Sequence, residues 1–179
     1  MLALTFLITT VIAIYTKVLL LRIWMQWARC DFYNPFSQFV VKITQPVIRP
    51  LRRIIPSIGP IDTASLLVAY VLSVIFLPVA LRQFTLDPLF LYLGLVLLIK
   101  AAGVLVFWVI IIRSLMSWIS QGRNPVDFVL MQLSEPLMAP FRRIIPPMGG
   151  IDFSAMAVIL ILYALNLLGL EYIPYWMQL

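Results

Sequence analysis

Histidine is absent from the 179 residues and cysteine occurs once, at Cys30. The chain therefore lacks the usual nitrogen and thiolate ligands of zinc, copper and iron–sulfur clusters, and it cannot form an internal disulfide. The Ser-His-Asp and Cys-His arrangements of nucleophilic catalysis are also excluded, because neither has its base. The seven acidic residues show no spacing that pairs two carboxylates. We therefore expect a non-enzymatic protein with no metal, haem or other cofactor.

Charged residues are scarce as well, at 11% of the chain, whereas soluble domains carry about 25%. Hydrophobic residues make up 63%, and the mean hydropathy is +1.05. This composition indicates an integral membrane protein. The net charge of +6 accompanies no nucleic-acid-binding motif, so in a chain this apolar it indicates attraction to anionic lipid headgroups rather than to DNA or RNA.

The sequence is a tandem duplication. When residues 34–62 are aligned with residues 124–152, 12 of the 29 pairs are identical. Earlier in each copy the matching pairs are Arg22 with Arg113, Met25 with Met116, and Trp27 with Trp118. We therefore expect two repeats. They are residues 1–86, with a loop at 28–60 between two spans, and residues 87–179, with a loop at 119–150.

Each repeat contains two apolar runs of about 20 residues or more, the length that a helix needs to cross a bilayer core. The expected spans are Leu2–Trp27, Ile61 to about Leu81, about Leu89 to Trp118, and Ile151 to about Tyr172. A cleaved signal peptide is the competing interpretation of the first run. No basic segment precedes that run and its counterpart lies in mid-chain, so we expect it to be retained. In the second span Ser65, Ala69 and Ser73 form a small-residue face suited to close helix packing in lipid.

Both loops contain an expected amphipathic helix. It starts at Asn34-Pro35 in the first loop and at Asn124-Pro125 in the second, with asparagine as the cap and proline in the first turn. Because proline interrupts a helix interior, we expect a second short helix to begin at Pro46 and at the equivalent position of the second repeat. The fold class is therefore an all-α membrane protein with four transmembrane helices in two parallel-repeated hairpins, each with a cytoplasmic amphipathic interfacial helix-turn-helix.

The end of each loop carries a turn and a helix cap. Gly59 and Gly149 supply the turn before the next apolar run. Asp62 and Asp152 follow at the start of that run, where a short acidic side chain accepts hydrogen bonds from the first N–H groups of a helix. The sequence therefore predicts that these two aspartates cap the second and fourth spans.

Basic residues concentrate in the two loops. They are Arg29, Lys42, Arg49, Arg52 and Arg53 in the first loop, and Arg123, Arg142 and Arg143 in the second. The positive-inside bias therefore places both loops in the cytoplasm and both termini on the periplasmic side. Since each repeat has an even number of spans, the two repeats insert in the same direction and form a parallel repeat.

Two stretches resemble the YggT/YlmG family. They are R-R-I-I-P-x-x-G-x-I-D, present twice, and L-L-L-R-I-W-M-Q-W-A-R-C-D-F-Y-N-P-F from Leu19 to Phe36. The resemblance covers nearly the whole chain and implies a bacterial inner-membrane protein. Members of the family have been connected with osmotic tolerance, potassium handling, cell division and envelope organisation. In chloroplasts they have been connected with thylakoid protein assembly and haem attachment to a cytochrome. The resemblance implies a role of this kind. Direct haem binding is not expected here, because the chain has no histidine.

The arginine pairs and the capping aspartates are the first candidate site. They are Arg52, Arg53 and Asp62 in the first repeat, and Arg142, Arg143 and Asp152 in the second. One interpretation is topological, since each basic residue near an anionic surface contributes about 1 kcal/mol of attraction. The other is a defined pocket for a phospholipid headgroup or a protein partner, with the aspartates orienting the guanidinium groups.

Lys100 is the second candidate. It lies about 13 residues from both Asp87 and Arg113, and thus roughly 20 Å from either end of its span. A cation at this depth has to face the helix bundle, and Gly103 and Phe107 share its face. It either bonds to Thr, Tyr, Asn166 or backbone carbonyls, or takes part in ion movement. Three further basic residues, Lys17, Arg22 and Arg113, are expected to snorkel to the inner surface.

Two functions follow from these observations. The first is a scaffold or assembly factor in envelope integrity and osmotic stress tolerance. The alternative is a subunit of a small oligomeric channel or transporter for ions such as potassium. The expected partners are anionic phospholipid headgroups and either an unidentified membrane protein or further copies of the chain, with no nucleic acid.

Overall fold

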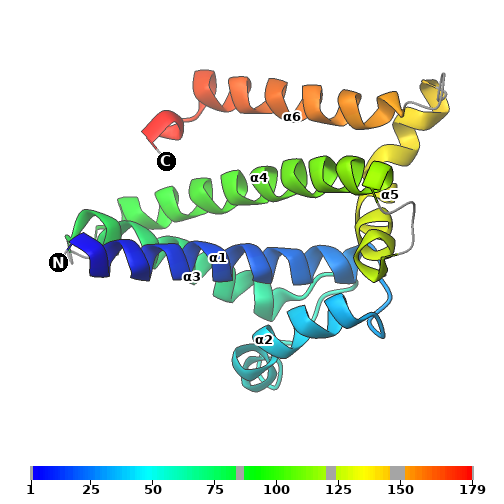
Figure 1. Cartoon of the computed structure of the whole chain (residues 1–179). Coiled ribbons are helices and arrows are strands. Elements are labelled where there is room, and N and C mark those ends of the chain that lie inside the picture. The colour runs from blue at the N-terminus through cyan, green and yellow to red at the C-terminus, as the bar shows by residue number, and fades with distance from the viewer. Residues whose placement is uncertain (1, 84–86, 120–123, 146–151, 179) are drawn as a thin grey trace. The chain divides into compact units, whose positions relative to one another are not determined.

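The structure is a computed structural model that describes residues 2–83, 87–119, 124–145 and 152–178 (Figure 1). These residues are all-α. The elements are α1 (Leu2–Trp27), α2 (Pro35–Leu51), α3 (Thr63–Leu81), α4 (Leu89–Ile119), α5 (Pro125–Ile144), α6 (Phe153–Tyr172) and the short 3₁₀ helix η1 (Trp176–Gln178).

Four of these helices, α1, α3, α4 and α6, are long and apolar enough to cross a membrane. This confirms the four expected spans and a multi-pass membrane protein. Residues 2–21 of α1 cover about 30 Å at 1.5 Å per residue, which is the thickness of the hydrocarbon core. Arg123, the turn at Gly149 and the start expected at Ile151 lie outside the described residues.

The described chain divides into two compact units. Unit 1 contains residues 2–27 and 40–105, and unit 2 contains residues 28–39 and 106–178. The division differs from the expected boundary between repeats at residues 86 and 87, because α2 and α4 each contribute residues to both units. Each unit is therefore described by itself.

In unit 1, α1 packs along α3. The buried core residues are Leu19, Leu20, Ile48, Ala64, Ala69 and Leu98. The expected small-residue face is buried, since Ser65 and Ala69 are 0% exposed and Ser73 is 2% exposed. A second close approach lies between α3 and α4, where a Cβ added to Gly94 would lie 2.9 Å from the backbone Cα of Val74.

In unit 2, α5 packs against α6. The buried core residues are Ile110, Met138, Ala155 and Val158. The 3₁₀ helix η1 follows α6 and packs on its last turn, because a Cβ added to Gly169 would lie 2.5 Å from the Trp176 ring. The Trp176 indole N–H donates to Asn166 Oδ1 at 3.0 Å.

The expected helix-turn-helix is wrong in both repeats. Pro46 and Pro50 lie inside the single helix α2, and Pro136 and Pro140 lie inside α5; Figure 1 shows both helices bending without breaking. Each proline frees the carbonyl four residues earlier. All four prolines are exposed, so the freed carbonyls can be solvated and the helices continue.

The caps are confirmed. The side-chain oxygens of Asn34 and Asn124 accept hydrogen bonds from the backbone N–H groups two residues later, both at 3.0 Å. Asp62 caps α3 and Asp152 caps α6. Gly59 has φ +60°, a left-handed conformation that glycine adopts readily and that fits the expected turn.

Candidate functional site

The first polar cluster is centred on Asp62, whose side chain is fully buried. Its carboxylate accepts from Arg22 Nε at 3.3 Å and from Arg52 Nη2 at 2.5 Å, both at Oδ2. The Ser65 backbone N–H donates to Oδ1 at 3.4 Å and the Ser65 hydroxyl donates to Oδ2 at 2.7 Å. One carboxylate therefore caps α3 and holds two arginines, Arg22 from α1 and Arg52 directly after α2.

Arg22 is buried inside this cluster, with 4% of the residue exposed. Its guanidinium also donates to Thr44 Oγ1 at 2.5 Å and to Gln45 Oε1 at 3.1 Å, both on α2. The expectation that Arg22 snorkels to the inner surface is wrong. Its guanidinium is held in the interior by the Asp62 carboxylate and by two neutral acceptors, Thr44 and Gln45, instead of by water. These bonds attach α2 to α1.

The electrostatics of Asp62 follow from these contacts. Burial raises the pKa of a carboxyl group, but the hydrogen bonds from Arg52 and Ser65 and the charge of Arg52 outweigh burial and hold the Asp62 pKa below its ordinary value. Asp62 is therefore ionised at neutral pH and serves as the counter-ion of both arginines.

The second cluster occupies the equivalent place in unit 2. Arg142 donates to Asp152 Oδ2 from Nε at 3.0 Å and from Nη2 at 2.7 Å, and to Glu135 Oε2 from Nη1 at 2.8 Å. Burial would raise the Asp152 pKa, but hydrogen bonds from Ser154 and Arg142 hold it below its ordinary value. Asp152 is 36% exposed, so this cluster is more solvated than the first.

Arg113 joins α4 to α5 in this second cluster. It donates to the Ser134 hydroxyl and lies 3.2 Å from Met138 Sδ. Ser134 is fully buried and donates to the Leu130 carbonyl at 2.8 Å. Arg113 therefore does not snorkel either, since its guanidinium is directed to a buried hydroxyl on the amphipathic helix.

The two clusters use the same positions. The matched pairs are Arg22 with Arg113, Thr44 with Ser134, Gln45 with Glu135, Arg52 with Arg142, and Asp62 with Asp152. They differ in charge. In the first cluster Arg22 and Arg52 share one carboxylate. In the second, Arg142 pairs with both Asp152 and Glu135, and Arg113 bonds to Ser134. Within the described residues the first cluster therefore carries an excess positive charge.

Sequence reasoning missed three members of each cluster. The first arginine of each repeat was assigned to snorkelling, and the hydroxyl and Gln/Glu positions on the amphipathic helices were not singled out. A signal was present, because the two repeats carry the same arginine, Arg22 and Arg113, although both positions lie within expected apolar spans.

The second arginine of each pair is placed differently from the first. Arg53 and Arg143 are exposed and lie outside the ion pairs that the described residues form. The structure thus brings together Arg52 with Asp62 and Arg142 with Asp152, and it leaves Arg53 and Arg143 at the surface.

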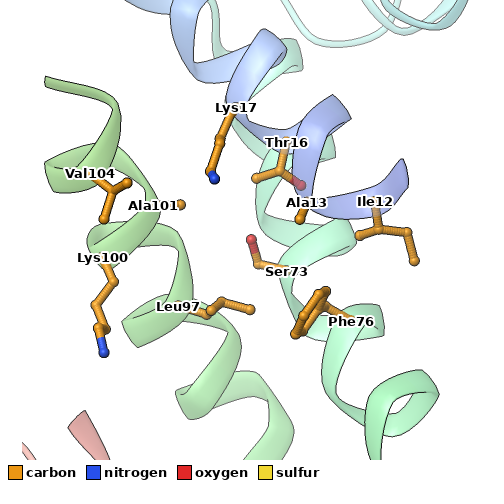
Figure 2. A pocket seen from close by; sticks show the side chains of 10 residues that line it. All are labelled: Ile12, Ala13, Thr16, Lys17, Ser73, Phe76, Leu97, Lys100, Ala101 and Val104. Carbon is orange, nitrogen blue, oxygen red and sulfur yellow. The ribbon is translucent and has the colours of Figure 1, made fainter. Parts of the chain in front are cut away.

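A separate cavity of about 200 Å³ lies in unit 1 (Figure 2). Its lining residues are Ile12, Ala13, Thr16, Lys17, Ser73, Phe76, Leu97, Lys100, Ala101 and Val104. In Figure 2 the amines of Lys17 and Lys100 do not point toward each other. Gly103, which shares the face of Lys100, is not a site of close helix packing, because a Cβ added there would meet nothing within 4 Å. The close helix contact of α4 in this unit is at Gly94 instead.

Cys30 is buried in unit 2, at 4% exposure. Burial raises the pKa of its thiol to about 11, so the thiol is protonated at neutral pH and is a poor nucleophile. Among the described residues, no three His, Cys, Asp or Glu side chains lie together as a metal site would require. The contacts that the two clusters do make are ion pairs, hydrogen bonds and helix caps.

Comparison with known proteins gives consistent matches along the chain. The family model described as CCB3/YggT matches residues 1–82 and again residues 92–173, as a repeat requires. The Escherichia coli K12 protein named "Uncharacterized protein YggT" is 60% identical over 92% of this chain and 87% of its own. A Vibrio alginolyticus protein named "Uncharacterized protein in proC 3'region" is 53% identical over 99% of both chains. No solved structure is similar to the chain. The chain belongs to the CCB3/YggT family of proteins.

Proposed function

We propose that this membrane protein is a non-enzymatic scaffold or assembly factor that acts in envelope integrity and osmotic stress tolerance. The observation that carries the proposal is the repeated polar cluster. In each unit, buried or half-buried arginines and aspartates attach an amphipathic helix to two spans, so the charged groups hold a surface in place. The lack of histidine and of a nucleophile–base pair in the sequence supports a role without catalysis.

The proposed location is the bacterial inner membrane, with the Arg-Arg loops in the cytoplasm and both termini in the periplasm. The distribution of basic residues between loops supports this orientation. Its partner is an unidentified membrane protein or a second copy of the chain, and it binds no nucleic acid. Reporter fusions after residue 83 and at the C-terminus test the orientation, and a cytoplasmic signal from either fusion contradicts it.

The alternative function is a subunit of a small oligomeric channel or transporter for potassium or a similar ion. The cavity in unit 1 favours it, because two lysines and two hydroxyls line a space between apolar spans. Four spans enclose little room, so this function requires several copies around a common pathway.

Complementation under osmotic challenge separates the two functions. A strain lacking the protein is given the wild type, Lys100→Leu or Asp62→Asn and is grown at high osmolarity. A scaffold requires the clusters and not the cavity, so Lys100→Leu restores growth and Asp62→Asn does not. The reverse pattern, together with potassium flux in proteoliposomes that Lys100→Leu abolishes, overturns the scaffold and supports the channel.

A further inference from the structure

The helix α2 has a face that packs inward. Val40, Thr44 and Ile48 recur every four residues, and all three are at most 3% exposed. Thr44 belongs to the Asp62 cluster, and Ile48 belongs to the core of unit 1. This face is accounted for by contacts within the chain.

The outward side of α2 carries two neighbouring stripes. Phe39, Ile43 and Val47 are also four residues apart and are 60%, 37% and 40% exposed. On the other flank lie the exposed cations Lys42, Arg49 and, just after the helix, Arg53. An apolar stripe beside a basic stripe is typical of a helix that lies in the plane of a membrane interface.

The equivalent apolar stripe of α5 is covered. Val129 and Leu133 occupy the positions of Phe39 and Ile43, and both are fully buried. The two amphipathic helices thus contact their clusters through equivalent residues. They differ at these two apolar positions, which are exposed in α2 and buried in α5.

The polar edge of α5 also makes hydrogen bonds within the chain. Gln132 stands where α2 has Lys42, and its Oε1 accepts from the Asp31 backbone N–H at 2.9 Å. The Asn34 side-chain amide donates to the Pro125 carbonyl at 2.8 Å. In unit 2 the segment 28–39 therefore bonds to α5 with neutral groups.

The two helices also differ in charge, and α2 is the more basic of the two. Ala139 stands where α2 has Arg49, and Glu135 stands where α2 has Gln45. Among the described residues 125–145, which contain α5, Arg143 is the one exposed cation. The outward face of α2 is therefore strongly basic, whereas α5 is close to neutral.

We propose that the outward face of α2, defined by Lys42, Arg49 and Arg53 together with its exposed apolar stripe, binds the headgroups of anionic phospholipids, and that α5 does not. Charge complementarity identifies the occupant. The cluster beneath this face also carries excess positive charge and lies about 30 Å along α1 from its start, a distance equal to the thickness of the hydrocarbon core. The proposal rests on the proposed function only for the placement of α2 at the membrane surface.

Lipid titration of the purified full chain in mild detergent tests the proposal. The probes are fluorescent phosphatidylglycerol and, as a neutral reference, phosphatidylcholine. We expect saturable binding of phosphatidylglycerol. Its affinity should fall when the salt concentration is raised about tenfold, from about 50 to about 500 mM, because salt screens exposed charges. Lack of preference for phosphatidylglycerol in the wild type, or a preference unaffected by salt, overturns the proposal without any variant.

Two variants with the same change in net charge locate the site. Lys42→Gln/Arg49→Ala gives α2 the residues that α5 carries. The control, Arg82→Gln/Arg143→Gln, removes two exposed cations elsewhere: Arg82 directly follows α3, and Arg143 lies in the last turn of α5. Each cation near an anionic surface strengthens binding roughly fivefold, so the α2 exchange should weaken phosphatidylglycerol binding about 25-fold. The control should change it less than about threefold. Equal losses in both variants mean a diffuse charge effect and overturn a site on α2.

The remaining outcomes are also decisive. If the α2 exchange leaves lipid binding intact and instead dissociates an oligomer in light scattering, the face binds a second copy and the proposal is wrong. Lipid binding by purified protein is independent of growth under osmotic stress. A chain that binds phosphatidylglycerol through α2 but fails as a scaffold in complementation therefore separates this inference from the proposed function.

Discussion

The substitution Asp62→Asn removes the charge from the centre of the first cluster and keeps a side chain that caps helices well. Asp62 is the carboxylate that the structure pairs with Arg22, whose side chain is only 5% exposed. The substitution removes this partner. Removing one partner of a buried ion pair costs about 3–5 kcal/mol. Arg22 keeps its bonds to Thr44 and Gln45, and Arg52 is 38% exposed and can turn to water. We therefore expect the lower end, about 3 kcal/mol.

Asp152→Asn is the matched control, because Asp152 has the same role in the second repeat. Its side chain is 36% exposed, and Arg142 keeps its bond to Glu135. An ion pair this solvated contributes about 1 kcal/mol or less. The two substitutions therefore change the same atoms at equivalent positions with unequal expected costs.

Thermal unfolding in detergent, followed by tryptophan fluorescence, measures the difference. At about 2–4 °C per kcal/mol for a chain of this size, Asp62→Asn should lower Tm by about 6–12 °C and Asp152→Asn by at most about 4 °C. Gln45→Glu should recover part of the loss in the Asp62→Asn background, since it supplies Arg22 with a carboxylate. Equal shifts for the two single variants, or a loss under 1 °C (about a third of a kcal/mol) for Asp62→Asn, would refute the assignment of a buried counter-ion.

Three further outcomes are expected. The folded-state pKa of Asp62 lies below its ordinary value, so the stabilisation by its carboxylate is complete above about pH 4 and is lost as pH falls through the folded pKa. Acid should therefore lower the Tm of Asp62→Asn less than that of the wild type. Parallel curves of Tm against pH for the two proteins would contradict this. Gly94→Ala should destabilise by about 1–3 kcal/mol because its Cβ would lie 2.5 Å from Val74 Cγ2. In the same unfolding assay Gly103→Ala, with nothing within 4 Å, should cost nothing and should stabilise by up to about 1 kcal/mol, since alanine favours a helix more than glycine does. Iodoacetamide should label Cys30, with its pKa of about 11, more than about 100-fold more slowly at pH 8 in the folded protein than in the unfolded chain. Rapid labelling would mean that Cys30 is not buried in the folded protein.

The spans and caps could be predicted because they are local. An apolar run long enough to cross a bilayer specifies α1 without reference to the rest of the chain. The Asn34 and Asp62 caps depend on backbone N–H groups two or three residues away. Such features survive any arrangement of the helices, so the sequence is sufficient to place them.

The continuity of the amphipathic helices could not be predicted in the same way. The cost of Pro46 inside α2 depends on whether the freed carbonyl of Lys42 can reach water, and the burial of this part of the helix is decided only when the chain folds, with Lys42 and Pro46 exposed. The bend that results leaves α2 with an inward face and an outward face over its whole length.

The cluster itself depends on contacts between distant residues. Arg22 and Asp62 are 40 positions apart, and their pairing requires that α1 and α3 pack with these residues at the same level. Sequence reasoning assigned Arg22 to the surface because a cation at the end of an apolar run usually reaches water. Its exact repetition as Arg113 was the available sign of a structural role, and the close approach at Gly94 had no such sign.

The placement of α2 at the membrane boundary is the central claim, and spin labels at Val47 and Arg49 in a Cys30→Ser background test it most directly. Both positions are exposed and lie on different stripes of the helix. In reconstituted vesicles, oxygen dissolved in the lipid should relax the Val47 label, and a water-soluble nickel complex should relax the Arg49 label. Equal relaxation of both labels by the nickel complex would place the whole helix in water and contradict the claim.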